Sequence, residues 1–164
     1  AYFANDERFG LIFINNCHHF EEVIKTFSTC LPMTHPGTVF LIDNVFPVDA
    51  FSALRDNEEA LRQRHAQGDL RKAWHGDVFK AAFVIKDLFP MWALSVIETG
   101  GNPQALVRGR RHQDRYVSRS EPRDHNTIEE AIAGEINYDE LMDRKSELNF
   151  VSETTALESV RRLR

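Results

Sequence analysis

The chain has 164 residues, of which 42% are hydrophobic and 27% charged, as expected for one globular domain with a real core. Its net charge of −5 argues against a dedicated nucleic-acid binder, because such proteins carry a basic excess, and we interpret the Arg108–Arg111 cluster as a solvated loop. The sequence has no apolar run of membrane-spanning length and no recognisable signal peptide. Cys17 and Cys30 lack metal-like spacing and are interpreted as reduced thiols. We therefore expect a cytoplasmic protein with no nucleic-acid or membrane partner.

Residues 9–47 predict a strand, a helix and a second strand. Leu11–Ile14 and Val39–Ile42 are continuous apolar runs, typical of parallel strands buried on both faces. Between them, apolar residues recur at helical spacing: Phe20, Val23, Ile24, Phe27, Cys30 and Leu31. In open parallel sheets, ligands bind beyond the carboxyl ends of the strands. In this chain those ends carry Asn15, Asn16, His18, His19, Asp43 and Asn44.

The next segments predict two helices and a hairpin. Asp49 is expected to cap a largely charged helix that runs to about Ala66. Asp77 is expected to cap a very apolar helix that ends before Pro90. Two strands follow, at residues 92–98 and 104–107, and their short connection requires them to be antiparallel. The sheet is therefore predicted to be mixed and the fold class α/β.

The C-terminal part predicts a polar loop at 111–126 and a helical tail at 127–164. The tail carries three helical signals: residues 127–133, a helix capped by Asn137 with Glu140 three residues on, and a helix from Ser152 to Arg162. Residues 1–110 then form the α/β domain proper.

Residues 9–47, followed by Trp74-His75-Gly76-Asp77-Val78-Phe79-Lys80, resemble the second half of class I S-adenosylmethionine-dependent methyltransferases. The closest group has a strand ending Ile-Asp-Gly-x-His, another ending His-Asp, Asp-Asp or Asp-Asn, and a later Trp-x-Gly-Asp-Val-x-Lys segment. The late hairpin suits that fold too, because one of its last two strands is antiparallel. The resemblance covers roughly residues 8–110, with the tail similar as well, and implies a Rossmann-like methyltransferase half-domain.

The chain departs from this family at several positions. Asn15-Asn16 stands where the family has Asp-Gly, Thr26 where an Asp is usual, and Thr38 where a second Gly follows Gly37. The family holds its cofactor with a glycine-rich loop after its first strand, and the present sequence has no G-x-G run. We therefore expect the cofactor half to lie upstream of Ala1, in a longer protein.

The resemblance implies a metal site and a cofactor contact. Asp43, Asn44 and Asn15 stand where metal-assisted members hold a divalent cation, and their oxygen atoms suit Mg²⁺ or Ca²⁺. Asn15 and Asn16 are also the candidate contacts to S-adenosylmethionine. The alternative is that Asp43 and Asn44 satisfy backbone groups in a turn.

The resemblance also implies an acceptor pocket. His18 is the candidate general base, because an imidazole titrates near working pH. Asp43 is the second candidate catalytic residue. The candidate acceptor contacts are His19, Trp74, Asp77 and Lys80. The alternatives are a capping or surface histidine, and a capped helix beside a buried tryptophan.

The leading functional hypothesis is methyl transfer from S-adenosylmethionine to an oxygen of a small or sugar-like acceptor. The second is a non-catalytic module that dimerises or binds a partner through an exposed sheet edge. A third is metal-dependent hydrolysis at Asp43, Asn44 and His18, for which the sequence offers few charged ligands.

Overall fold

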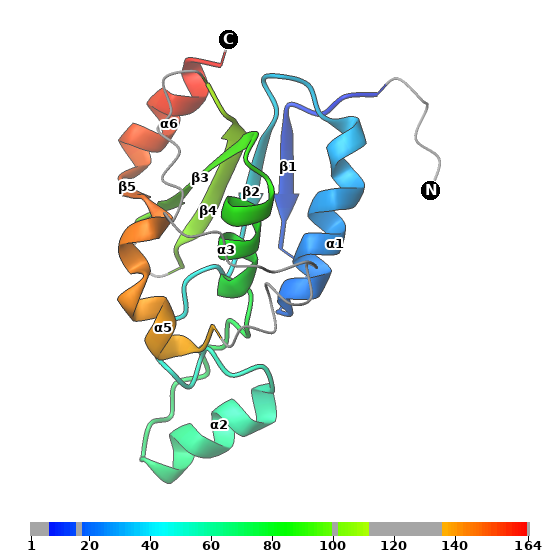
Figure 1. Ribbon diagram of the computed structural model, residues 1–164. Helices are drawn as coiled ribbons and strands as arrows, with labels where there is room; N and C mark the ends of the chain where they lie inside the picture. Colours follow the sequence, from blue (N-terminus) through cyan, green and yellow to red (C-terminus); the bar gives the residue numbers. More distant parts are fainter. Residues whose placement is uncertain (1–6, 16–17, 100–101, 112–135, 164) are drawn as a thin grey trace.

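The computed structural model describes residues 7–15, 18–99, 102–111 and 136–163. Within these residues it shows an α/β arrangement with a five-stranded mixed sheet and five helices (Figure 1). The predicted fold class is therefore confirmed at this level. Several predicted features lie outside the described residues: Asn16, Cys17, residues 100–101 of the connection between the hairpin strands, the helix at 127–133, and all but the first residue of the polar loop at 111–126.

The sheet has the strand order β1-β2-β4-β3-β5. Its strands are β1 (Leu11–Ile14), β2 (Val39–Ile42), β3 (Trp92–Ile97), β4 (Gln104–Gly109) and β5 (Phe150–Val151). β1 and β2 are parallel, as predicted. β3 and β4 form the predicted antiparallel hairpin, and β4 inserts between β2 and β3. The short strand β5, which the sequence did not predict, pairs parallel with β3.

One face of the sheet carries the main core. The helices α1 (Phe20–Cys30) and α3 (Phe79–Leu88) pack against it with their apolar residues, and α1 follows its predicted bounds to within one residue. Phe27 of α1 contacts Phe40 of β2, with ring centroids 4.6 Å apart. The segment after the polar loop closes the same core through Leu141 of α5 (Tyr138–Asp143) and Leu148 of the 3₁₀ turn Lys145–Leu148.

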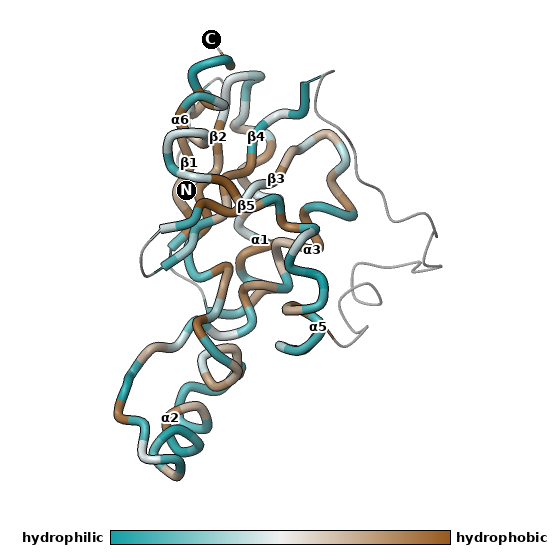
Figure 2. Tube along the Cα trace, turned by 90° about the vertical axis from the view of Figure 1, so that its left-hand side faces the viewer, coloured by the Kyte–Doolittle hydropathy of each residue, from teal (hydrophilic) through white to brown (hydrophobic). Residues whose placement is uncertain are grey.

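The opposite face is covered only in part by the described residues. Helix α6 (Glu153–Arg161) packs Ala156 against Val39 and Leu106, on the other side of the strands from α1 and α3 (Figure 2). On β1, Leu11 is 58% exposed and Phe13 is 53% exposed. The prediction that β1 is buried on both faces is therefore wrong. The reason is that its inner face packs against α1, whereas no described helix covers its outer face.

The helix α2 (Asn57–Ala66) protrudes from the end of the domain at which β1 and β2 terminate, and it is mostly hydrophilic (Figures 1 and 2). Its N-cap is Asp56, seven residues after the predicted cap Asp49, and Asp56 accepts from the N–H of Glu59 at 2.8 Å. Asp49 instead accepts from the N–H of Ser52 at 2.8 Å and from the fully buried Arg64 at 2.6 Å. Arg64 also pairs with Asp69 at 2.8 Å, so ion pairs rather than apolar burial hold α2 in place.

The predicted cap at Asn137 is confirmed, and the last helix begins next to Ser152, as expected. Asn137 accepts from the N–H of Glu140 at 3.0 Å, and Ser152 accepts from the N–H of Thr155 at 3.2 Å. The 3₁₀ turn Leu31–Met33, which contains Pro32, follows directly after α1. None of the helices in the described part of the chain is long and apolar enough to cross a membrane.

Candidate functional site

The segment that holds Trp74 and Asp77 lies against the turn between β1 and α1. The N–H of Asp77 donates to the carbonyl of His18 at 3.1 Å. Gly76 has a φ of +66°, and a Cβ atom added to it would lie 1.9 Å from that carbonyl oxygen. Only glycine fits this close approach. The two motif segments, which are distant in the sequence, therefore meet at the carboxyl end of β1.

Asp77 is a capping residue, but for a different helix from the one predicted. Its Oδ1 accepts from the N–H of Phe20, the first residue of α1, at 3.0 Å. The N-cap position of α3 is occupied by Val78, whose side chain has no polar atom. A carboxylate near a helix N-terminus also interacts favourably with the helix dipole. The prediction that Asp77 caps its own helix is thus wrong, because a neighbouring helix offers the same unpaired N–H groups.

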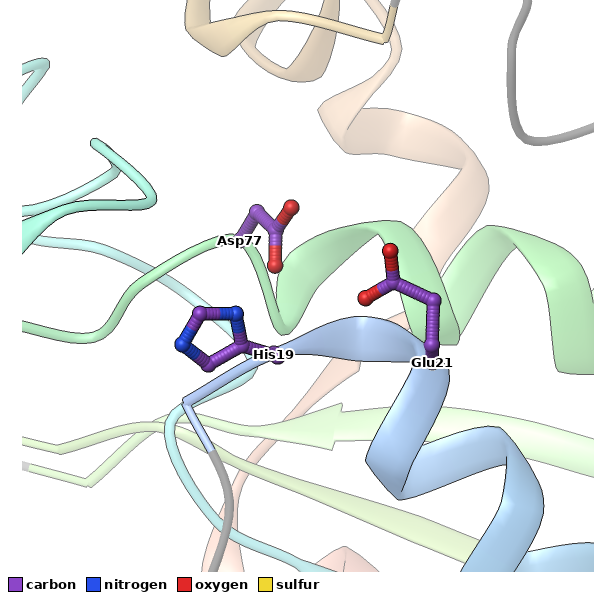
Figure 3. A group of neighbouring side chains, drawn as sticks. All are labelled: His19, Glu21 and Asp77. Carbon is purple, nitrogen blue, oxygen red and sulfur yellow. The ribbon is translucent and has the colours of Figure 1, made fainter.

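His19, Glu21 and Asp77 form a compact group in which one ligand atom of each lies within 4.8 Å of the others (Figure 3). Their cationic partner is Arg55, whose Nη1 lies 2.8 Å from Glu21 Oε1 and 3.0 Å from Asp77 Oδ2. Burial raises the pKa of Glu21, but the hydrogen bond and the charge of Arg55 outweigh it and lower that pKa overall. Lys80 Nζ lies 3.8 Å from Asp77 Oδ2. The carboxylates are therefore neutralised by side chains of the protein.

Trp74 organises both histidines of the site. The ring of His18 stacks on Trp74 with a centroid distance of 4.2 Å and an angle of 16° between the rings. His19 meets the same indole edge-on at 6.5 Å. The indole Nε1 donates to the carbonyl of Leu54 at 2.8 Å, which fixes the ring. The predicted acceptor residues His18, His19, Trp74, Asp77 and Lys80 are thus brought together.

Asp43, the predicted metal ligand, is engaged by amide groups. Its buried Oδ1 accepts from Asn102 Nδ2 at 2.7 Å and from Gln104 Nε2 at 3.2 Å. Asn44 adopts a left-handed conformation with a φ of +62°, and Asn15 is exposed. Two N–H donors aimed at one oxygen suit a carboxylate acceptor and compete with a cation. The described residues therefore do not fit a divalent metal here, and we base no step on one. Asn16 cannot be placed, because it lies outside the described residues.

Sequence reasoning missed His75 as a site residue. The residue is 6% exposed, and its backbone N–H donates to the backbone carbonyl of Ser52 at 2.9 Å. Burial lowers the pKa of its imidazole, as does the neighbouring charge of His18, while Asp43 opposes the shift. His75 directly follows Trp74, whose ring stacks on His18, so it lies beside the predicted base. The sequence signal that could have identified it is its place at the x position of the Trp-x-Gly-Asp segment, between Trp74 and Gly76.

A large groove lies elsewhere, between α6 and the incompletely covered face of the sheet. It has a volume of about 1000 Å³ and is lined mainly by apolar residues, including Leu11, Leu41, Leu106, Leu157 and Val160. His35 and Glu153 contribute polar groups to its lining. This groove contains none of the predicted site residues.

Comparisons with protein-family models, with curated proteins and with solved structures find no match for this chain. The functional argument therefore rests on the residues and their geometry.

Proposed function

We propose that this chain is the acceptor-binding half of a Rossmann-like, S-adenosylmethionine-dependent O-methyltransferase domain. The observation that carries the proposal is the convergence of His18 and His19 with Trp74 and Asp77 at the carboxyl end of β1. The antiparallel strand β4, inserted between β2 and β3, agrees with the late antiparallel strand of the family. The site residues and the antiparallel strand follow one another along the chain in the same order as in the family that the sequence resembles.

In this proposal His18 takes the proton of the acceptor hydroxyl. An imidazole is well suited to this role, since its ordinary pKa is close to physiological pH. Stacking on Trp74 restricts the orientation of the His18 ring, and the hydrogen bond from Asp77 N–H to the His18 carbonyl fixes the backbone beneath it. A fixed base adjacent to a bound hydroxyl lowers the barrier by pre-orienting the reacting groups.

S-adenosylmethionine would supply the methyl group, but the residues of this chain do not form a complete site for it. A glycine-rich loop is not present in the sequence, and the candidate cofactor residue Asn15 is exposed. We therefore propose that the cofactor-binding half comes from outside these 164 residues. In this proposal its source is the coding sequence upstream of Ala1.

The test is transfer of a labelled methyl group by the upstream-extended protein to a panel of small hydroxylated acceptors. We expect His18→Ala to reduce the rate by about 100-fold, the usual contribution of a general base. The matched control is His65→Ala on the exposed surface of α2. Transfer at the same rate in both variants would refute the role of His18, and no transfer to any acceptor would refute the proposed reaction.

The exposed face of β1 favours a second candidate, self-association. Leu11 and Phe13 are more than half exposed, and no described strand pairs with the outer edge of β1. The occupant that best fits this edge is a second copy of the chain, because two identical edge strands pair in an antiparallel manner about a two-fold axis. Sedimentation of the chain tests this alternative directly.

A further inference from the structure

Three buried polar atoms near the carboxyl ends of β1 and β2 lack a hydrogen-bond partner among the described residues. They are Nδ1 of His18, Nδ1 of His75 and Oδ1 of Asn102. Leaving a buried polar atom unpaired costs about 1–3 kcal/mol, and folded proteins rarely leave several together. Such a group therefore points to a ligand that completes these bonds.

Backbone and side-chain contacts bring the three residues to the same end of the sheet. The N–H of Asp43 donates to the carbonyl of Ile14 at 3.0 Å, which joins the ends of β1 and β2. Asn102 Nδ2 donates to Asp43 Oδ1, and a carboxylate only accepts, so the amide oxygen of Asn102 must face elsewhere. Gly76, the residue after His75, approaches the carbonyl oxygen of His18 so closely that an added Cβ would lie 1.9 Å from it, which holds His75 beside the His18 turn.

A single metal ion does not explain this arrangement. Among the described residues, the acidic, histidine and cysteine side chains whose ligand atoms all lie within 4.8 Å of one another are His19, Glu21 and Asp77. His18, His75 and Asp43 do not form such a group. Ligands of one ion must lie within about 4 Å of each other, since each bond is about 2 Å long. The partner must be larger and must carry several polar groups.

We propose that His75 and Asn102, together with His18, bind a polyhydroxylated small molecule. Asn102 Oδ1 requires a donor, whereas the Nδ1 atom of a neutral imidazole accepts or donates according to its tautomer. A hydroxyl group meets both demands because it donates one hydrogen bond and accepts others. Neighbouring hydroxyls, as in a sugar ring or a ribose, can reach several of these atoms at once.

This inference deepens the proposed function, since a bound hydroxyl beside His18 is the group that would accept the methyl. Hydroxyl binding itself requires no S-adenosylmethionine. Polyol binding without methyl transfer would therefore refute the proposed reaction and leave the subsite intact. If the protein transfers methyl groups and replacing His75 and Asn102 does not change polyol binding, the proposed subsite is refuted and the proposed reaction stands.

The test is a titration of the 164-residue chain, followed by the ring ¹⁵N resonances of its histidines in NMR. The probes are methyl glucoside, adenosine and tetrahydropyran, a ring ether without hydroxyl groups. We expect saturable shifts at His75 and His18 with a hydroxylated probe and none with tetrahydropyran. A response to methyl glucoside alone indicates a sugar subsite, and a response to adenosine indicates a ribose subsite.

Two variants and one control complete the experiment. His75→Phe keeps a flat ring and the backbone bond to Ser52, and Asn102→Leu removes the amide oxygen. Each should weaken polyol binding about tenfold, the equivalent of one hydrogen bond, whereas His65→Phe on α2 should not. If His75→Phe does not fold, Asn102→Leu carries the test. No saturable shift at His75, equal shifts with tetrahydropyran, or unchanged affinity in a folded variant would overturn the proposal.

Discussion

The carboxylate of Asp77 caps a helix to which it does not belong, because its Oδ1 lies 3.0 Å from the backbone nitrogen of Phe20 at the start of α1. The backbone N–H of Asp77 also donates to the carbonyl of His18. One residue thus fixes both sides of the turn that carries the histidines. The geometry of the candidate site depends on this contact.

The first prediction concerns Asp77. Asp77→Ala leaves the N–H of Phe20 unpaired and removes the buried partner of Arg55, so we expect a loss of about 3 kcal/mol in the free energy of unfolding. Asp77→Asn retains an oxygen acceptor and should lose about 1 kcal/mol. Urea denaturation measures both. The exposed Asp143 on α5 is the control, and Asp143→Ala should change stability by less than about 0.5 kcal/mol. Equal losses in all three variants would contradict the capping role.

The second prediction compares two glycines that both have a positive φ. Gly68 has a φ of +76° and open space where a Cβ would be, whereas the Cβ of an alanine at Gly76 would meet the carbonyl of His18 at 1.9 Å. Gly68→Ala should therefore cost only the left-handed backbone penalty of about 1 kcal/mol. Gly76→Ala must also push the 74–77 segment away from the His18 turn. We therefore expect its loss in the free energy of unfolding to exceed that of Gly68→Ala by at least about 2 kcal/mol.

Thermal or urea unfolding measures this difference. The fluorescence of Trp74 gives a second readout, because its ring stacks on His18 only while the segments remain in contact. If the two alanine variants are equally stable and equally fluorescent, the close approach is not a constraint on the fold.

The third prediction concerns the exposed edge of the sheet. If two copies pair through β1, Leu11→Lys and Phe13→Lys should convert a dimer into a monomer in sedimentation velocity experiments, because a lysine on each copy introduces repulsion. The control is Leu70→Lys, since Leu70 is 78% exposed but lies near α2. A wild-type chain that sediments as a monomer at all concentrations would exclude this association.

The fourth prediction concerns acid stability. Burial raises the pKa of Glu147, but hydrogen bonds from Arg144 and Lys86 outweigh it and hold the pKa at about 2, below the ordinary value of 4.5. A carboxyl group with a lowered pKa in the folded state stabilises the fold above pH 4.5, and the stabilisation is lost as the pH falls toward 2. This contribution amounts to at most about 3 kcal/mol.

Glu147→Gln should therefore flatten the decline in the free energy of unfolding between pH 5 and pH 2, as followed by urea denaturation. Glu153→Gln, at the exposed start of α6, is the matched control and should leave the decline unchanged. A decline of the same steepness in Glu147→Gln and in the wild type would show that Glu147 is not the group responsible.

Local patterns predicted the elements that form within a single stretch of chain. The strands β1 and β2, the helix α1 and the hairpin of β3 and β4 follow from apolar runs, helical spacing and one short turn. The same local reasoning located the Asn137 cap and the start of α6. Each of these depends on residues that are neighbours in the sequence or on a short connection.

Contacts between distant residues account for what the sequence did not predict. Arg64, fully buried, binds Asp49 and thereby shortens α2 at its start. The two-residue strand β5 is too short to produce an apolar pattern and depends on β3 for its pairing. The burial of His75 depends on how the 74–77 segment lies against Ser52, which no periodicity encodes.

The measurement that tests the central claim most directly is isothermal titration calorimetry with S-adenosylmethionine and S-adenosylhomocysteine. It should be performed on this chain and on a version that includes the coding sequence upstream of Ala1. We predict saturable binding to the extended version and none to the 164-residue chain, whose sequence lacks a glycine-rich loop. Absence of binding to both versions would contradict the methyltransferase proposal and leave self-association through β1 as the better account.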